Sequence, residues 1–455
     1  MSEPTRVPWR TVLAYGAPAT GAGYMYLILS LYVMKFATDV LLIAPAIMGV
    51  IFSLSRIWDA ISDPLVGYLS DKTTAKYGRR RTWILASSVP IALGFYMVFA
   101  PPLSLTGDAL AIWMGVAIIA FYSAMTIFFV PHLSLGAELS IDYHERSRLF
   151  GARHAAYIFG SILSLISLQL LINREFAGGD VRALADQLAM LAVIIMTGLV
   201  VYAAINLRER EEFQGRSPES VLKAFKDIWQ NKHARLLIVV TFIEHVGSAA
   251  IGALTLYVTQ YVVGKPAWAP LIILAYMLPS STSVPLWLPL SRRFGKIRVW
   301  MGGMVLYGLS FGGMFFLPFM DSETMRLVWI IVMAFFAGLA NGCGGTIGPS
   351  VQGDVIDYDE YVSGERKEGA YFAAWNFVYK SATGLMLLMT GFALAWSGFV
   401  PNVEQTMTVK MTLVTLYGLF PLVCYGIGAY LFSKFELDEA AYNDIRASLD
   451  ARANT

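Results

Sequence analysis

Two aspartates and one arginine interrupt an apolar segment that is long enough to cross a lipid bilayer. The segment runs from Pro45 to Leu69, and Arg56, Asp59 and Asp63 occur at spacings that place all three on one face of a helix. A carboxylate at membrane depth costs at least about 2.5–3.5 kcal/mol, so it needs a partner or a use. Such a face fits either a cation pathway or a structural ion-pair network. One arginine cannot neutralise two acids, and this favours the cation pathway.

The remaining chain is also apolar, and its pattern indicates many membrane spans. Of 455 residues, 56% are hydrophobic and 15% are charged, whereas about 25% are charged in a typical soluble domain. Apolar runs of roughly 20 residues, the length that spans a bilayer core, alternate with short charged stretches. The sequence therefore predicts an all-α polytopic membrane protein. About twelve spans are expected, at 11–38, 45–69, 82–100, 109–135, 149–172, 186–206, 235–263, 268–290, 297–318, 326–350, 369–397 and 408–433.

Basic residues gather in alternate loops, which predicts the orientation of the chain. Lys and Arg are concentrated in loops 72–81, 146–148, 292–298 and 366–367, and they are sparse in the intervening loops. By the positive-inside rule, both termini are then cytoplasmic. No signal peptide is recognisable at the N-terminus. We expect a multi-pass monomer in the plasma membrane, the inner membrane of a bacterium, surrounded by lipid and without affinity for nucleic acid.

The chain divides into two related halves of six spans each. The expected parts are an N-terminal bundle, a cytoplasmic linker, and a C-terminal bundle with a short tail, at 1–207, 208–234 and 235–455. Asp63-Pro64-Leu65, followed by Leu69-Ser70, recurs as Val284-Pro285-Leu286, followed by Leu290-Ser291; Gly151–Phe159 likewise resembles Gly369–Phe377. Parallel repeats of this kind build alternating-access carriers, in which the substrate site lies between the halves near the bilayer midplane.

The charged residues of the spans favour a cation site. Asp59 and Asp63 present hard oxygen ligands one helical turn apart, which suit Na⁺, Li⁺ or a proton. Ser62 adds a hydroxyl beside them, and Thr126 in the fourth span either adds another or bonds back to its own helix. Lys380 lies near mid-membrane in the eleventh span, where a lysine pairs with a carboxylate or loses its charge, and the two aspartates are its expected partners. In the repeat, Asp63 and Lys380 align with apolar residues, so these charges do not belong to a shared scaffold.

Further polar residues in the spans fit a substrate site. Trp375 and Asn376 combine an aromatic ring with an amide, which suits a sugar, and packing is the alternative. Arg153, near the start of the fifth span, either lines the cavity or anchors the helix end. Glu244 and His245 in the seventh span form a proton relay, line the cavity, or make an interhelical hydrogen bond. The sequence contains no nucleophile triad, metalloprotease motif or ATP-binding motif, so we expect neither an enzyme nor a cofactor, and an ion gradient remains as the energy source.

Parts of the sequence resemble known families. Gly67–Lys72 together with Gly78–Arg81 is similar to the loop 2–3 signature of the major facilitator superfamily. Arg56–Pro64, which reads Arg-Ile-Trp-Asp-Ala-Ile-Ser-Asp-Pro, resembles the second helix of the glycoside–pentoside–hexuronide:cation symporters. Asp354–Tyr358 and Lys380 fit the tenth and eleventh helices of that family. The resemblance covers nearly the whole chain.

With this resemblance, the candidate residues fall into three groups. The coupling cation, Na⁺ or H⁺, is expected at Asp59, Asp63, Ser62 and Thr126. The substrate or the coupling network is expected at Arg56, Arg153, Trp375, Asn376, Lys380, Glu244 and His245. The cytoplasmic gate is expected at Asp71, Arg79, Arg80, Glu138, Asp142, Arg146, Asp354 and Asp357.

The chain departs from the melibiose carrier of that family at three positions. Acids that hold galactosyl hydroxyls in the melibiose carrier are replaced by Gly23 in the first helix and Phe129 in the fourth, and a tryptophan is replaced by Leu133. The resemblance therefore implies a less polar pocket and a different substrate.

We predict a cation-coupled symporter for a glycoside or a similar small sugar, which works by rocking of two six-helix bundles. The alternative is a lipid or lysolipid carrier of the same fold, because lysolipid carriers of animals are distant members of the group. A membrane sensor or a membrane enzyme is a remote alternative.

Overall fold

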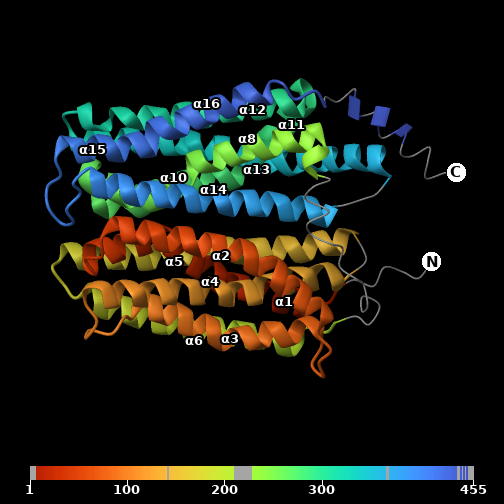
Figure 1. Ribbon diagram of the computed structural model, residues 1–455, viewed down its shortest axis with the longest axis horizontal. Coiled ribbons are helices and arrows are strands. Elements are labelled where there is room, and N and C mark those ends of the chain that lie inside the picture. The colour runs from red at the N-terminus through yellow and green to blue at the C-terminus, as the bar shows by residue number, and fades with distance from the viewer. Residues whose placement is uncertain are drawn as a thin grey trace. The chain divides into compact units, whose positions relative to one another are not determined.

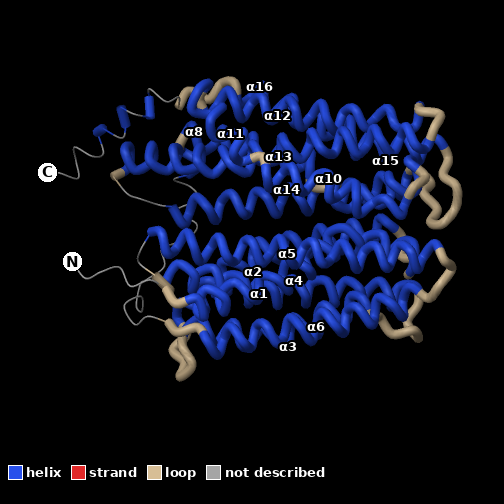
Figure 2. The backbone as a smooth tube through the Cα atoms, turned by 180° about the vertical axis from the view of Figure 1, so that it is seen from behind, coloured by secondary structure: helices blue, strands red, loops and turns tan. Residues whose placement is uncertain are grey.

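The computed structural model consists of helices joined by short loops (Figures 1 and 2). It describes residues 7–140, 143–209, 228–364, 368–437, 441–442, 444–445 and 447–448. All regular structure in these residues is helical, which confirms the predicted all-α class. The chain forms two compact units, unit 1 (Met1–Pro218) and unit 2 (Glu219–Thr455). Much of the predicted linker, residues 210–227, lies outside the described residues.

Unit 1 is built from six long helices that correspond to the first six predicted spans. They are α1 (Trp9–Lys35, continued by a π-helical turn, Phe36–Val40), α2 (Pro45–Lys72), α3 (Arg79–Phe99), α4 (Gly107–Glu138), α5 (Tyr143–Phe176) and α6 (Val181–Asn206). α1 packs along α5 and α6, and α3 packs along α4 and α6. α2 packs mainly along α4, so α4 positions the helix that carries the acidic face.

Unit 2 has the same number of spans, several of them made of more than one helical segment. They are α8 (Lys232–Ser248) with α9 (Ile251–Tyr257) and a π-helical turn (Val258–Val263); a 3-10 turn (Pro266–Trp268) with α10 (Ala269–Thr282) and α11 (Val284–Phe294); α12 (Lys296–Gly313) with a 3-10 turn (Met314–Phe319); α13 (Glu323–Ser363); α14 (Glu368–Trp396); and α15 (Met407–Val414) with a π-helical turn (Thr415–Leu419) and α16 (Phe420–Phe432). A buried cluster that includes Trp287, Trp300 and Phe432 forms part of the core of this unit.

The helices account for the predicted number of spans. In the described residues, ten helices are long and apolar enough to cross a membrane, and a bent pair, Pro266–Thr282 with Val284–Phe294, makes an eleventh. α2, at 28 residues, is long enough but is not among these helices. Its charged residues Arg56, Asp59 and Asp63 make it less apolar than the others. With α2 included, this part of the chain contains the twelve expected spans.

The two copies of the repeated proline stretch fold differently. α2 continues through Pro64, the one proline in its interior. In unit 2 the corresponding span breaks at Ser283 and bends by 49°. Pro279, Pro285 and Pro289 follow one another closely there, and each lacks a backbone donor and crowds the preceding turn. The additional prolines therefore explain the bend that the shared proline does not cause in α2.

α13 extends well beyond the predicted end of its span. The span was expected at 326–350, whereas the helix runs from Glu323 to Ser363. Beyond the predicted span, charged residues start at Asp354, and the apolar run ends there. The backbone hydrogen bonds of a helix do not require apolar side chains, so the helix can continue. Asp354 and Asp357 consequently stand on a helical extension at the end of unit 2.

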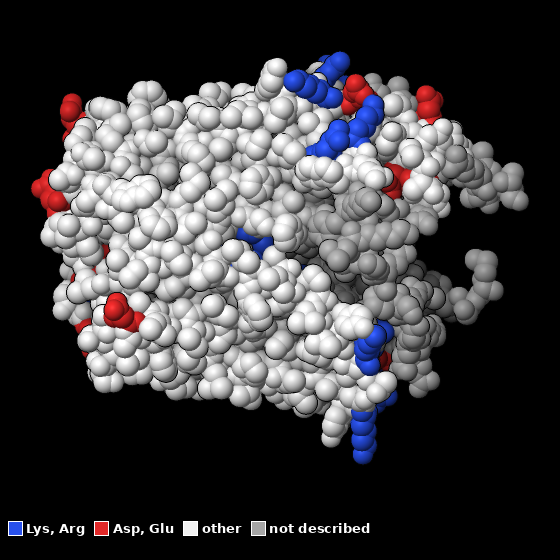
Figure 3. All heavy atoms as spheres, in the orientation of Figure 1, with Lys and Arg blue, Asp and Glu red and all other residues white. Residues whose placement is uncertain are grey.

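Charged side chains gather at the ends of the helices. On the face drawn in Figure 3, most of the surface between the ends of each bundle is uncharged. Lys and Arg side chains of each unit are concentrated at one end of its bundle in this view, and Asp and Glu are more frequent at the other. An uncharged belt with polar ends is what a bilayer requires of the protein surface.

A carboxylate that follows the last helix of unit 1 caps the start of α3. The Oε atoms of Glu209 accept hydrogen bonds from the backbone N–H groups of Arg79 to Arg81, at 2.7–2.8 Å. These donors of the first turn have no partner within the helix, and they favour a negative charge. Gly78 precedes them at φ +107°, and a Cβ there would lie 2.5 Å from Oε1 of Glu209. Glycine at this position therefore permits both the turn and the cap.

Glu209→Ala removes the acceptor for three backbone donors, so we expect a loss of about 1 kcal/mol in stability, as for other helix caps. The apparent melting temperature of the detergent-purified protein should fall by about 2–4 °C when it is followed by intrinsic fluorescence. Arg208→Ala is the control, because Arg208 is exposed at the neighbouring position and should melt like wild type. A Glu209→Ala protein that melts with the control would show that the cap is dispensable.

Candidate functional site

The acidic face predicted on α2 lies within unit 1, with one acid buried and the other half-buried. Asp59 is 3% exposed, and its Oδ2 lies 3.3 Å from Nη1 of Arg56, one helical turn earlier. The guanidinium carbon of Arg56 lies 3.8 Å from the centroid of the Tyr122 ring in α4, a cation–π contact. Arg56 is therefore positioned by an acid on its own helix and by an aromatic ring on α4.

Asp63 is joined to α4 by a hydrogen bond. The hydroxyl of Thr126, a buried residue, donates to Oδ1 of Asp63 at 2.8 Å. Of the two alternatives for Thr126, a bond to its own helix or an oxygen beside the acids, the structure shows the second. Ser62 differs, because its hydroxyl donates to the backbone oxygen of Asp59 at 3.4 Å. Asp63 and Thr126 thus form the polar pair that links the two helices.

A second bond fixes α2 against α4. Nε1 of Trp58 donates to the hydroxyl of Ser123 at 2.7 Å, and Ser123 in turn donates to the carbonyl oxygen of Ile119 at 2.7 Å. Ser123 and Thr126 are three residues apart and therefore lie on one face of α4. Two bonds at successive turns set the rotation of α2, and with it the direction of its carboxylates.

Three aromatic rings, Tyr26 of α1 with Tyr122 and Phe129 of α4, form an aromatic shelf beside the acidic face. The ring centroid of Tyr26 lies 6.1 Å from that of Tyr122 and 5.4 Å from that of Phe129. Arg153 of α5 places its guanidinium carbon 5.6 Å from the centroid of Phe129. Within the described residues no carboxylate pairs with Arg153, and its buried Nε has no acceptor. The shelf thus places aromatic rings next to a guanidinium that pairs with no carboxylate of the described residues.

Gly23 and Gly160 let α1 and α5 approach more closely than side chains would allow. A Cβ at Gly23 would lie 2.1 Å from the carbonyl oxygen of Tyr157, and a Cβ at Gly160 would lie 1.8 Å from that of Thr20. Both distances are far inside van der Waals contact, and the obstacle is backbone. The acid that the resemblance places at position 23 therefore has no room in this chain.

The three candidates on α14 have different environments. The side chain of Trp375 is 5% exposed and packs against Tyr371 in the core of unit 2. Its position favours the packing alternative over stacking on a sugar. Asn376 is exposed, and Lys380 is half-buried on the same helix. The pairing of Lys380 with the acids of α2 stays a prediction.

Glu244 and His245 are neighbours on α8 that face different helices. Glu244 is 6% exposed and lies against Gly428 of α16, where an added Cβ would be 3.3 Å from its Cγ. Nδ1 of His245 donates to the carbonyl oxygen of Thr241 at 2.7 Å, and the His245 ring meets Tyr379 of α14 edge-on. In the described residues no hydrogen bond joins the two side chains, so the structure does not arrange them as a relay.

Each unit has a charge clamp at the end of its bundle, formed by residues predicted for the gate together with Lys296, which was not predicted. In unit 1, Nη2 of Arg79 and Nη2 of Arg80 lie 2.8 and 3.4 Å from Oε1 of Glu138. In unit 2, Nζ of Lys296 lies 2.8 Å from Oδ2 of Asp354. Each clamp joins the first turn of the third span of its unit to the fourth span, and Arg80–Glu138 and Lys296–Asp354 have the same separation of 58 residues. The clamps are equivalent parts of the repeat, and each acts within its own unit.

The other gate candidates are described only in part. Asp357 accepts a hydrogen bond from the hydroxyl of Tyr442 at 3.0 Å. Asp142 lies outside the described residues, and so do the side chains of Asp71 and Arg146. A latch between Asp71 and the basic cluster therefore stays a prediction.

Sequence reasoning missed two charged clusters of unit 1. Glu209, the cap of α3, falls in the hydrophilic stretch that was assigned to the linker. Lys35 is 2% exposed and pairs with both Asp39 and Glu175, which ties the end of α1 to the end of α5. Lys35 and Asp39 have the i, i+4 spacing of a helical ion pair, a signal that could have identified them. Glu175 is 140 residues from Lys35 and gives no local signal.

Gly23→Asp installs the acid of the melibiose carrier, and we expect it to destabilise the protein without conferring melibiose uptake. The new side chain would press on the backbone of α5, and overpacking of this kind typically costs about 1–3 kcal/mol. Gly151→Ala, also on the α5 side of the unit, is the control, because a Cβ at Gly151 meets nothing within 4 Å. Size-exclusion chromatography after heating compares the two proteins. Equal survival of both would contradict the close packing of α1 on α5.

Comparison with known proteins places the chain in a transporter family. A family model described as MFS/sugar transport protein matches residues 14–439. An inner membrane symporter of Escherichia coli (strain K12) is 25% identical over 428 residues, which cover 93% of this chain and 90% of that protein. A putative glycoside/cation symporter of the same organism is 24% identical over 451 residues, which cover 98% and 95%. A crystal structure of the nucleoside transporter NupG shares the fold, with a TM-score of 0.68 at 14% identity over 94% of this chain and 99% of that one.

These findings confirm the predicted fold, the predicted resemblance to glycoside/cation symporters, and the expectation of a transporter instead of an enzyme. The family model spans most of the chain, from the first helix to beyond the last. The protein therefore belongs to the MFS/sugar transport family, and it is a multi-pass membrane transporter.

Proposed function

We propose that the protein takes up a glycoside or a similar small sugar, and that its coupling cation, Na⁺ or H⁺, binds at Asp59 and Asp63 on α2. The hydrogen bond from Thr126 to Asp63 carries this proposal. It brings a third hard oxygen, from a different helix, to the acidic face. Oxygen ligands from two helices are a better basis for a cation site than two acids on one helix.

The charges on α2 support the binding of one monovalent cation. Asp59 and Asp63 contribute two negative charges, and Arg56 contributes one positive charge 3.3 Å from Asp59. Among these three residues the acids exceed the base by one charge, which one Na⁺ or one H⁺ would offset. Because an unbalanced charge in hydrocarbon is costly, occupancy by the cation would favour the states in which the carrier can change its conformation.

The proposed sugar contacts come from the aromatic shelf and Arg153. A sugar ring can stack its apolar face on Phe129 or Tyr26, and its hydroxyl oxygens can accept hydrogen bonds from the guanidinium of Arg153. Neither Gly23 nor Phe129 supplies a carboxylate, so we expect melibiose and other α-galactosides to be poor substrates. The family match favours a sugar over a lysolipid as cargo.

We further propose a monomer in the plasma membrane, the inner membrane of a bacterium, with both termini in the cytoplasm. In unit 1, Arg10 at the start of α1 donates to Asn206 at the end of α6, at 2.7 Å, so these two ends lie together. The basic first turn of α3, from Arg79 to Arg81, is linked to the same end through Glu209. The positive-inside rule assigns such a basic end to the cytoplasm.

Thr126→Val keeps the shape of threonine and removes its hydroxyl, so it should raise the half-saturating cation concentration roughly 10- to 100-fold, the equivalent of one hydrogen bond to a charged group. Asp63→Asn should abolish accumulation of sugar but leave its exchange, because exchange needs no net movement of the cation. Both variants are assayed by the uptake of a panel of glycosides into proteoliposomes with an imposed Na⁺ or H⁺ gradient.

Thr126→Ser is the matched control, because it retains the hydroxyl and should retain the cation dependence of wild type. If Thr126→Val also behaves like wild type, Thr126 does not belong to the cation site. Accumulation by Asp63→Asn at the level of wild type would reject the assignment of the cation to α2.

A further inference from the structure

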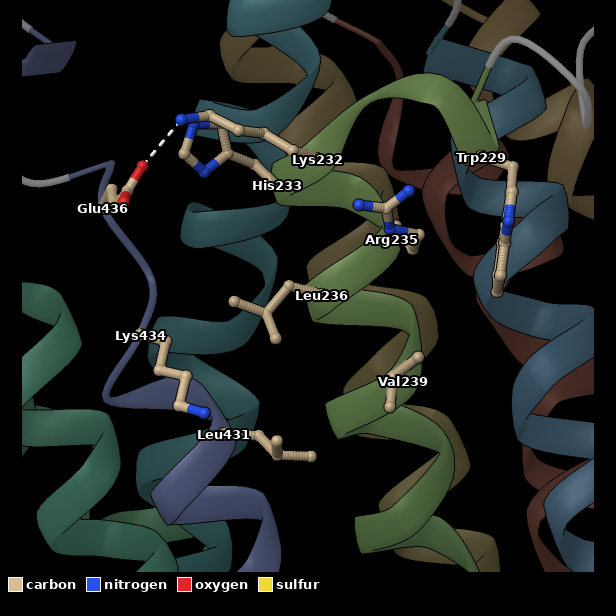
Figure 4. A pocket seen from close by; sticks show the side chains of 9 residues that line it. All are labelled: Trp229, Lys232, His233, Arg235, Leu236, Val239, Leu431, Lys434 and Glu436. Carbon is tan, nitrogen blue, oxygen red and sulfur yellow. Dashed lines mark hydrogen bonds and ion pairs between the residues drawn. The ribbon is translucent and has the colours of Figure 1, made fainter.

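A pocket of about 390 Å³ opens at the end of unit 2 where α8 begins and α16 ends (Figure 4). α8 supplies Arg235, Leu236 and Val239 to its lining. The last turn of α16 supplies Leu431, and Lys434 lies two residues beyond the end of that helix. The cation site and the aromatic shelf belong to unit 1, so this pocket is a separate feature of the molecule. It is open to one side and polar at its rim.

The rim of the pocket carries an excess of positive charge. Nζ of Lys232 pairs with Oε2 of Glu436 at 2.6 Å, so these two charges compensate each other. That ion pair lowers the pKa of Glu436 below its ordinary value and keeps it ionised. Within the described residues, Arg235 and Lys434 have no carboxylate partner, and the ammonium of Lys434 lies 4.7 Å from the ring of Tyr430. Two cations are thus left for an anion.

The pocket changes from charged to apolar along the helices. Arg235 lies in the first turn of α8, and Val239 lies one turn deeper in the span. On the other side, Leu431 lies within α16 and Lys434 just beyond its end. Leu236 is only half-buried although it is apolar. A ligand with an anionic headgroup at the rim could therefore place an apolar tail along the helices.

The N-terminal end of α8 also has the features of a membrane interface. Trp229 lines the pocket and is 53% exposed just before α8 begins. Exposed tryptophans concentrate at the level of the lipid headgroups. The first N–H groups of α8 are already capped by Asn231, so the binding of an anion has to come from the side chains. The charge, the apolar depth and the tryptophan all fit a lipid better than a soluble ion.

We propose that this pocket binds the phosphate headgroup of an anionic phospholipid, with Arg235 and Lys434 as ligands of the phosphate. A guanidinium binds phosphate through two parallel hydrogen bonds, and the ammonium adds a point charge. One acyl chain lies along Leu236, Val239 and Leu431. Basic pockets between membrane helices at the headgroup level recognise lipids in this way.

The test uses the full-length protein and native mass spectrometry with phosphatidylglycerol, phosphatidylcholine and inorganic phosphate as probes. Arg235→Gln with Lys434→Gln should weaken phosphatidylglycerol binding roughly 25-fold, about fivefold for each lost charge, and should leave phosphatidylcholine binding unchanged. Arg292→Gln with Arg293→Gln is the control. Both arginines are exposed at the end of α11, so this pair removes the same charge from the same unit and should bind lipid within about twofold of wild type.

Size-exclusion chromatography confirms that each variant is folded before the lipid titration. Phosphatidylglycerol binding by Arg235→Gln/Lys434→Gln at the strength of the control overturns the proposal. The proposal is also overturned if millimolar inorganic phosphate displaces the lipid or binds the wild type in its place, because the pocket would then recognise a soluble anion. Selective loss of phosphatidylglycerol in the pocket variant, without competition by phosphate, supports a lipid site.

Discussion

The cost of placing two carboxylates at membrane depth determines how α2 is built into unit 1. Asp59 lies beside Arg56, and Asp63 accepts a hydrogen bond from Thr126. α4 supplies Thr126, the Tyr122 ring next to Arg56, and the hydroxyl that binds Trp58. α2 is thus held on α4 by polar contacts, and these contacts aim the acids. The contacts that hold α2 on α4 are therefore also the contacts of the proposed cation site.

Close packing on the other side of unit 1 limits what the proposed substrate site can contain. α1 meets α5 at Gly23 and Gly160, where any side chain would run into backbone. This contact removes the position from which the melibiose carrier presents an acid. Phe129 fills the second such position, its ring lies edge-on to that of Tyr26, and the guanidinium of Arg153 lies beside it. The chain has therefore exchanged carboxylates for an aromatic surface while it retains the acids of α2.

Much of the fold could be predicted because membrane spans are long and separated by charged loops. Thr126 could be named as a candidate from its depth in the fourth span, but its choice of Asp63 as acceptor depends on tertiary packing. Trp375 is the converse case: its residue type left a sugar contact and packing both open, and only its burial in unit 2 favours packing. The helix α13 is longer than its predicted span because hydropathy predicts the segment within the bilayer and does not predict where the helix ends outside it. The clamp between Lys296 and Asp354 could have been inferred from the repeat, since its separation equals that of Arg80 and Glu138.

Direct binding of the cation to the purified protein in the absence of sugar tests the central claim. Calorimetric titration with NaCl, combined with counting of bound protons by a pH indicator, detects either coupling ion. We predict saturable binding of one monovalent cation by wild type, seen as Na⁺ uptake or as one additional titrating proton, and its loss in Asp63→Asn. Binding by Asp63→Asn with the affinity and proton count of wild type would contradict the assignment of the cation to the acidic face of α2.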